Sequence, residues 1–181
     1  MTTTRSSPSS TVGAVIRGRR THKTYGPRPV DRDTLDELFE LARWAPNHHL
    51  TNPWRFRVIG PEALARLKVA CDAAKPGSAR KLDRARTLIA VTARQTGDAA
   101  QDREDMLATG VASYIVLLAA HARGLAGYWR TLDVLAEPAG RAALGIPDDE
   151  VPIALLHLGD PAHAPADTDR APVEEIVSYL D

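Results

Sequence analysis

The longest uncharged apolar run of the chain, residues 107–120, is the feature that most limits how the chain can fold. It contains 14 residues without a charged side chain, fewer than the roughly 18 that a membrane-spanning helix needs. The surrounding pattern, from Glu104 to Arg123 and ending at Gly124, predicts the longest helix of the chain, apolar nearly all round in its middle. We therefore expect no membrane span, but a buried helix at the centre of a folded domain.

Hydrophobic periodicity places the other elements on either side of this helix. The pattern predicts helices over residues 11–19, capped by Thr11, and over 31–45, 62–74 and 138–144. Apolar or alternating runs predict strands over residues 54–59, 87–93, 128–130 and 153–158. The polar residues 95–105 predict a loop or lid before the longest helix.

The length of the chain favours one domain. Its 181 residues show no internal repeat and no linker to a second domain, and 44% are hydrophobic, as in an ordinary globular protein. We expect a disordered tail over residues 1–11 and a single domain over residues 12–181. Within that domain, residues 162–181 are expected to form an extended arm that ends in a short apolar element, 173–180.

Charge and cysteine content exclude several classes of protein. The 23 Lys and Arg residues balance the 23 Asp and Glu residues, so no overall field draws the chain to nucleic acid or membrane. The first 30 residues contain six basic and no acidic side chains, which favours a local anion site. Cys71 is the only cysteine, which excludes an intrachain disulfide and a four-cysteine cluster and fits a reducing cytoplasm.

A basic cluster is the first candidate site. The chain lacks the His-Glu-x-x-His, Gly-x-Ser-x-Gly, Walker and Gly-x-Gly-x-x-Gly motifs, which disfavours the common hydrolase and Rossmann classes. Arg19, Arg20, Thr21 and Lys23 place three cations and a hydroxyl at a helix end, a donor set suited to a phosphate or a polarised carbonyl. The alternative is a solvated basic helix end that offsets the helix dipole.

A donor-rich loop is the second candidate. Residues 45–54, Ala-Pro-Asn-His-His-Leu-Thr-Asn-Pro-Trp, join a predicted helix to a predicted strand. Loops held by rigid elements often carry binding residues. Taken alone, His48 and His49 are more often surface histidines than functional groups.

Four segments, in order, resemble motifs of the nitroreductase family of flavin enzymes. Residues 19–25 resemble the family's Arg-Arg-Ser-x-Arg/Lys opening, and residues 45–54 resemble its Ala-Pro-[Ser/Asp]-[Ser/His]-x-x-x-Gln-Pro-Trp motif. Residues 124–131 are similar to the Gly-[Phe/Leu]-Gly-x-x-Trp-Arg-[Ser/Thr] segment of its small single-domain branch. Residues 144–161, which begin Leu-Gly-Ile-Pro, resemble the ending of that branch. The resemblance spans residues 12–161.

The resemblance implies a bound FMN and assigns its contacts by position. The implied cofactor-binding residues are Arg19, Arg20, Thr21, Lys23, His48, Asn52, Trp129, Arg130 and Thr131. Asn52 stands where the family has Gln and is one methylene shorter, and Trp44 stands where close relatives can carry Arg. No general acid or base and no metal ligand is assigned, because the flavin carries the chemistry.

The resemblance also implies a fold, an assembly and an activity. The fold is α+β, with a mainly antiparallel sheet of four or five strands wrapped by helices in an intertwined homodimer. Each FMN lies at the interface, and residues 173–180 cross to the partner's sheet. The implied reaction has two steps: NADH or NADPH reduces FMN, and a small-molecule oxidant such as a nitroaromatic or quinone then takes the electrons.

Other activities stay open at this point. Within the family, the same site could serve dehalogenation, enone reduction or oxidation of a heterocycle. Outside enzymes, the basic start could belong to a non-catalytic module that binds a polyanion. For the remaining residues we expect Trp54, Phe56 and Tyr114 in the core, Cys71 as a buried, unreactive thiol, and residues 148–150 as a solvated turn.

Overall fold

A four-stranded antiparallel sheet forms the centre of the computed structural model, which describes residues 9–165 and 168–180. The strand order is β1-β2-β4-β3, and each neighbouring pair is antiparallel. The strands are β1 (Trp54–Val58), β2 (Thr87–Arg94), β3 (Ala126–Arg130) and β4 (Glu150–Gly159). The predicted α+β class, with four or five mainly antiparallel strands, is confirmed.

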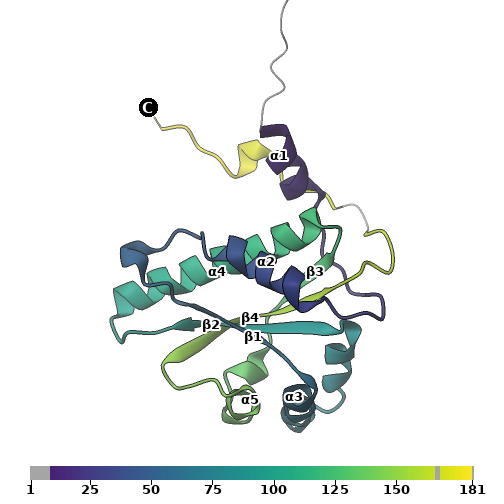
Figure 1. Cartoon of the computed structure of the whole chain (residues 1–181). Helices are drawn as coiled ribbons and strands as arrows, with labels where there is room; N and C mark the ends of the chain where they lie inside the picture. The colour runs from purple at the N-terminus through teal and green to yellow at the C-terminus, as the bar shows by residue number, and fades with distance from the viewer. Residues whose placement is uncertain (1–8, 166–167, 181) are drawn as a thin grey trace, which may run out of the picture.

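Helices cover both faces of this sheet (Figure 1). On one face lie α2 (Arg32–Ala42) and the long α4 (Ala99–Ala122), and on the other lie α3 (Pro61–Ala74) and α5 (Pro138–Leu144). The first helix, α1 (Ser9–Gly18), extends away from this body on the side of α2 and α4. Apolar cores result on both faces, and β2 is buried along its first seven residues because it contributes side chains to each face.

Local sequence signals explain why α2 forms where it was predicted. The Asp31 side chain caps the helix by accepting a hydrogen bond from the Thr34 N–H at 2.8 Å. Leu35, Leu38 and Ala42 then recur at helical spacing and are buried against the sheet face that α4 shares. The predicted helix of residues 138–144 likewise appears with the same bounds as α5.

Two predicted boundaries are wrong. Helix α1 begins at Ser9, so Thr11 lies inside the helix rather than at its cap, and residues 1–8 of the expected tail lie outside the described residues. Residues 95–105 are not a lid, because α4 already begins at Ala99. Asp98 Oδ1 accepts hydrogen bonds from the N–H groups of Ala100 and Gln101, each at 2.9 Å, and so caps the helix. The polar residues that suggested a loop therefore start the helix instead.

Helix α4 is long and apolar enough to cross a membrane by length and composition alone, but half of its apolar window is buried inside the protein. It packs on α2 and on the sheet, as the prediction of a central helix requires. The burial is not complete, however. Leu107, Val111 and Tyr114 are 68%, 42% and 38% exposed, so the prediction that Tyr114 belongs to the core is wrong.

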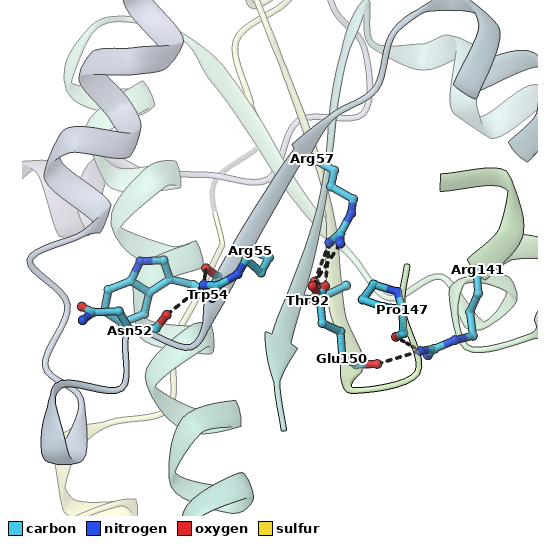
Figure 2. Close-up of polar contacts among 8 residues, drawn as sticks. All are labelled: Asn52, Trp54, Arg55, Arg57, Thr92, Arg141, Pro147 and Glu150. Carbon is cyan, nitrogen blue, oxygen red and sulfur yellow. Dashed lines mark hydrogen bonds and ion pairs between the residues drawn. The ribbon is translucent and has the colours of Figure 1, made fainter. Parts of the chain in front are cut away.

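The predicted solvated turn at residues 148–150 is also wrong at its last position. Glu150 is buried, and its carboxylate accepts hydrogen bonds from Arg57 Nη1 at 2.7 Å and Nη2 at 3.0 Å (Figure 2). Thr92 Oγ1 also donates to this carboxylate. The expected burial of Trp54 and Cys71 is confirmed. In the described part of residues 162–181, every residue is exposed and only Val173–Glu175 form a turn of 3-10 helix.

Candidate functional site

The basic cluster runs beside the outer edge of β3. Thr21 pairs in parallel with Gly127, and the His22 N–H donates to the Gly127 carbonyl at 3.1 Å. The structure therefore brings together two segments that the sequence separates by about a hundred residues, 19–23 and 126–131. Both were predicted to contact the same cofactor.

Arg19 offers an unused donor within this cluster. Its guanidinium lies over the Tyr114 ring, 5.8 Å from the centroid, and its Nε is buried without a hydrogen-bond partner among the residues that the structure describes. Burial lowers the pKa of His121 nearby, and the charges of Arg19 and Arg20 lower it further. A positive field and an unsatisfied N–H together suit an anion.

The other members of the basic cluster are less confined. Arg20 Nη1 donates to the Arg19 carbonyl at 3.2 Å and to the carbonyl of Arg17. Thr21 and Lys23 are exposed. Their side chains are therefore accessible to a bound molecule along the β3 edge.

Side chains alternate between the two faces of β3, which separates the predicted cofactor contacts Trp129 and Arg130. Trp129 faces α4. A Cβ atom placed at Gly110 of α4 would lie 3.9 Å from the Trp129 ring. Arg130 faces the opposite side of the sheet, where it lines a cavity together with Cys71 and Thr131. Its Nη1 is buried, and no hydrogen-bond partner for it lies within residues 9–165 or 168–180. Trp129 and Arg130 thus serve different faces of the sheet.

The cavity at Arg130 is lined by further basic side chains that the sequence analysis did not single out. Its volume is about 680 Å³, and its wall comes from α3, the segment after it, and the residues that follow β3. Lys75 and Lys81 join Arg130 in that wall, and Asp133 and Glu137 are the acids. Nothing in the sequence distinguishes these lysines from other surface lysines, because only the fold brings them to Arg130.

His157 is a buried imidazole on the same face as Arg130. It is fully buried on β4, with its ring centroid 6.5 Å from that of Tyr25 and 5.4 Å from that of Tyr128, and neither of its ring nitrogens has a hydrogen-bond partner in the described part of the chain. Burial lowers the pKa of His157 to about 4, and the charges of Arg130 and Arg84 act in the same direction. Burial likewise raises the pKa of the Tyr25 hydroxyl. Both groups are uncharged near neutral pH.

The second candidate loop, residues 47–52, has an unusual backbone. His49, Leu50 and Asn52 have φ angles of 55°, 51° and 47°, a region that residues other than glycine seldom adopt. Asn47 Oδ1 accepts from the Asn52 N–H at 2.9 Å, and Asn52 Nδ2 donates to the Leu50 carbonyl at 2.7 Å. The Asn52 amide is therefore engaged with its own loop. Strain of this kind persists only where surrounding contacts impose it.

Those contacts come from β1 and α4. Arg55 Nη1 donates to the Asn52 carbonyl at 2.9 Å (Figure 2). Thr51 Oγ1 donates to the buried carboxylate of Asp105 at 2.6 Å, and His48 Nδ1 lies 2.5 Å from Glu104 Oε2. The loop is thus fixed to the first turns of α4 by two adjacent acids.

The two candidate sites lie apart in one chain. Glu104 contacts His48 of the loop, whereas Tyr114 contacts the Arg19 guanidinium of the basic cluster. Glu104 and Tyr114 are ten residues apart on α4, which corresponds to about 15 Å along the helix. The structure therefore joins the basic cluster to β3, and the His48 loop to the start of α4, but not these two groups to each other.

Comparison with known families decides what kind of protein carries this arrangement. The sequence profile described as the Nitroreductase family matches residues 16–160, which include both candidate sites and the whole sheet. This chain belongs to the nitroreductase family. The predicted resemblance is therefore confirmed.

Other members of the nitroreductase family match most of the chain. “Putative NAD(P)H nitroreductase YfhC” from Bacillus subtilis is 27% identical over 175 residues, 89% of this chain and 90% of that protein. The crystal structure of a nitroreductase-like family protein from Bacillus cereus is 25% identical and covers all of both chains, with a TM-score of 0.85. The “putative nitroreductase in complex with fmn” from Desulfovibrio desulfuricans is 25% identical and covers 94% of this chain and 96% of its own, with a TM-score of 0.77.

Proposed function

We propose that this protein is an FMN-dependent oxidoreductase that takes electrons from NADH or NADPH and delivers them to a nitroaromatic or quinone acceptor. Three comparisons support the proposal: the family match, the name of the Bacillus subtilis relative, and the FMN complex of the Desulfovibrio relative. The nature of the acceptor and the order of the two steps follow from the family resemblance.

The observation that carries the proposal is an unsatisfied cationic donor on each face of the sheet. Arg19 Nε, beside α4, and Arg130 Nη1, which borders the cavity of about 680 Å³ on the other face, are both buried without a hydrogen-bond partner among the described residues. Leaving a buried charged donor unpaired is costly, so these atoms fit a site completed by an anionic group. When bound, FMN would supply the electron-transfer chemistry, and the protein would supply binding, orientation and charge.

The basic cluster would hold the anionic part of the cofactor. Arg19 and Arg20 can donate in the forked geometry that a phosphate accepts, with Thr21 as a hydroxyl donor. Lys23 would place a positive charge where the flavin ring gains negative charge on reduction. Trp129 and Thr131 would contact the cofactor from β3 and the residue after it.

The His48 loop would complete the site from a second copy of the chain. Its separation from the basic cluster along α4 argues against one chain supplying both groups to one flavin. The exposed apolar residues of α4, Leu107, Val111 and Tyr114, provide a surface for such a partner. Residues 173–180 would cross to the partner's sheet, and the cytoplasm would supply the nicotinamide donor.

Steady-state kinetics test the proposal. NADH or NADPH oxidation by the FMN-loaded protein would be followed with p-nitrobenzoate or p-benzoquinone as the acceptor. A two-step exchange at one site predicts parallel lines in double-reciprocal plots. FMN-loaded protein that oxidises neither nucleotide with either acceptor would overturn the proposed reaction, and intersecting lines would overturn the two-step order.

A further inference from the structure

The His48 imidazole has one engaged nitrogen and one free nitrogen. Nδ1 lies 2.5 Å from Glu104 Oε2, whereas no hydrogen bond to Nε2 is formed by any other residue of the described chain. A carboxylate only accepts hydrogen bonds, so this contact requires the proton on Nδ1. Nε2 is then the atom that the ring presents outward.

The surroundings hold the ring in this orientation. The His49 ring stacks on His48 with centroids 3.8 Å apart and planes 16° apart. The loop cannot readily turn away, because Thr51 is bonded to buried Asp105, the next residue of α4 after Glu104. Gln101 Nε2 also donates to Asp105 at 3.0 Å, which fixes the second acid in turn.

We infer that Glu104 is a positioning residue for His48: it holds the proton on Nδ1 and directs Nε2 toward the bound flavin. The inference rests on the proposed function, because that function places His48 at FMN. The acidic group that contacts the imidazole is Glu104 from α4, and the His49 ring stacks on it within the loop; the neighbouring Asp105 is bonded to Thr51 and Gln101 instead. A hydrogen bond to one ring nitrogen is the usual way in which proteins set the role of the other.

An incidental surface contact is the competing explanation. The His48 and Glu104 side chains are 58% and 45% exposed, and exposed ion pairs often contribute little. In that case Glu104 would leave the tautomer of His48 and the affinity for FMN unchanged. The two explanations therefore differ in what removal of the carboxylate does.

The first experiment reads the tautomer directly in apoprotein. Long-range 1H–15N spectra of uniformly 15N-labelled protein at about pH 8.5, where imidazoles are neutral, report which ring nitrogen carries the proton. His48→Gln identifies the His48 signals. We expect the Nδ1–H form in wild type and in Glu104→Gln, whose amide oxygen can still accept, and a shift toward the Nε2–H form in Glu104→Ala. Glu40→Ala, at another exposed helical glutamate, should change nothing.

The second experiment measures FMN affinity by fluorescence quenching in the same variants. Loss of the oriented imidazole should weaken FMN binding about tenfold in Glu104→Ala and less in Glu104→Gln. Wild-type affinity and an unchanged His48 tautomer in Glu104→Ala would overturn the inference. If wild-type protein bound no FMN, the proposed function would fail, while the tautomer spectra would still show whether Glu104 orients His48.

Discussion

Arg57 and Glu150 form a partly buried ion pair that spans the sheet, with Arg57 Nη1 2.7 Å from Glu150 Oε2 (Figure 2). Arg57 lies on β1 and Glu150 on β4, on either side of β2, whose Thr92 donates to the same carboxylate. Burial alone would raise the pKa of Glu150, but the hydrogen bonds from Arg57 and Thr92 and the charge of Arg57 outweigh it and lower the pKa. The pair therefore ties three strands together at one point.

Removing one partner should be destabilising. Glu150→Ala leaves the partly buried Arg57 guanidinium without its carboxylate partner, and we expect the free energy of unfolding to fall by about 1 to 3 kcal/mol. Urea denaturation at pH 7 measures the change, with Glu40→Ala as the exposed control. A loss no greater than that of the control would show that water replaces the carboxylate at no cost.

The same carboxylate predicts part of the acid sensitivity. A lowered pKa in the folded state means that Glu150 stabilises the fold above its unfolded pKa of 4.5, and that this stabilisation is lost as the pH falls through the lower folded value. Urea midpoints between about pH 5 and 3 should therefore fall more steeply for wild type than for Glu150→Gln. Parallel curves would contradict the assignment.

His157 should act in a higher pH window. Its pKa is lowered from 6.5 to about 4, so between these pH values His157 is protonated in the unfolded chain but neutral in the folded chain. Stability should decline as the pH falls from 6.5 toward 4, by roughly 3 kcal/mol at most, and level off below that value. His157→Phe removes the titrating group and should flatten this part of the stability curve. An unchanged slope in the variant would rule out His157 as its source.

Gly140 is required by a close approach of two backbone segments. A Cβ atom at this position would lie 1.8 Å from the Val134 carbonyl oxygen, a contact that no side-chain rotation relieves. Gly140→Ala should destabilise the protein by about 2 to 4 kcal/mol. Gly110→Ala is the matched control, because its nearest atom would be 3.9 Å away and alanine favours the helix. Equal melting temperatures for the two variants would contradict the close approach.

The basic cluster predicts a loss of cofactor binding without a loss of fold. Arg19→Ala removes a cationic donor whose buried Nε has no partner within the described structure. FMN affinity should fall by about 10- to 100-fold, the range expected for one charge-assisted contact, while circular dichroism stays unchanged. Arg17→Ala, an exposed arginine in the last turn of α1 two residues before Arg19, is the control. An Arg19→Ala protein that keeps wild-type FMN affinity would exclude Arg19 from the site.

The sequence predicted the elements whose signals are local. The Asp31 cap and the apolar spacing of α2 lie within one short segment, and both appear as expected. Glu150 looked solvated because its partner Arg57 is 93 residues away, and only the sheet brings them together. Residues 95–105 suggested a loop because polar capping groups such as Asp98 resemble loop residues until the helix that they start is seen.

The candidate site was likewise predictable where its signals are local, but not where it depends on contacts between distant segments. The basic cluster and the His48 loop were found from short motifs, but their separation along α4 depends on the fold. The opposite orientation of Trp129 and Arg130 follows from strand alternation and was available from the sequence. The cavity at Arg130, with Lys75 and Lys81 in its wall, was not, because three separate segments form it.

The visible absorption spectrum of freshly purified protein tests the central claim most directly. After reconstitution with FMN and removal of unbound cofactor, the proposed function predicts flavin bands near about 370 and 450 nm. Under anaerobic conditions, NADH or NADPH should bleach the longer-wavelength band. Protein that stays colourless after reconstitution, or a bound flavin that neither nucleotide bleaches, would contradict the proposal.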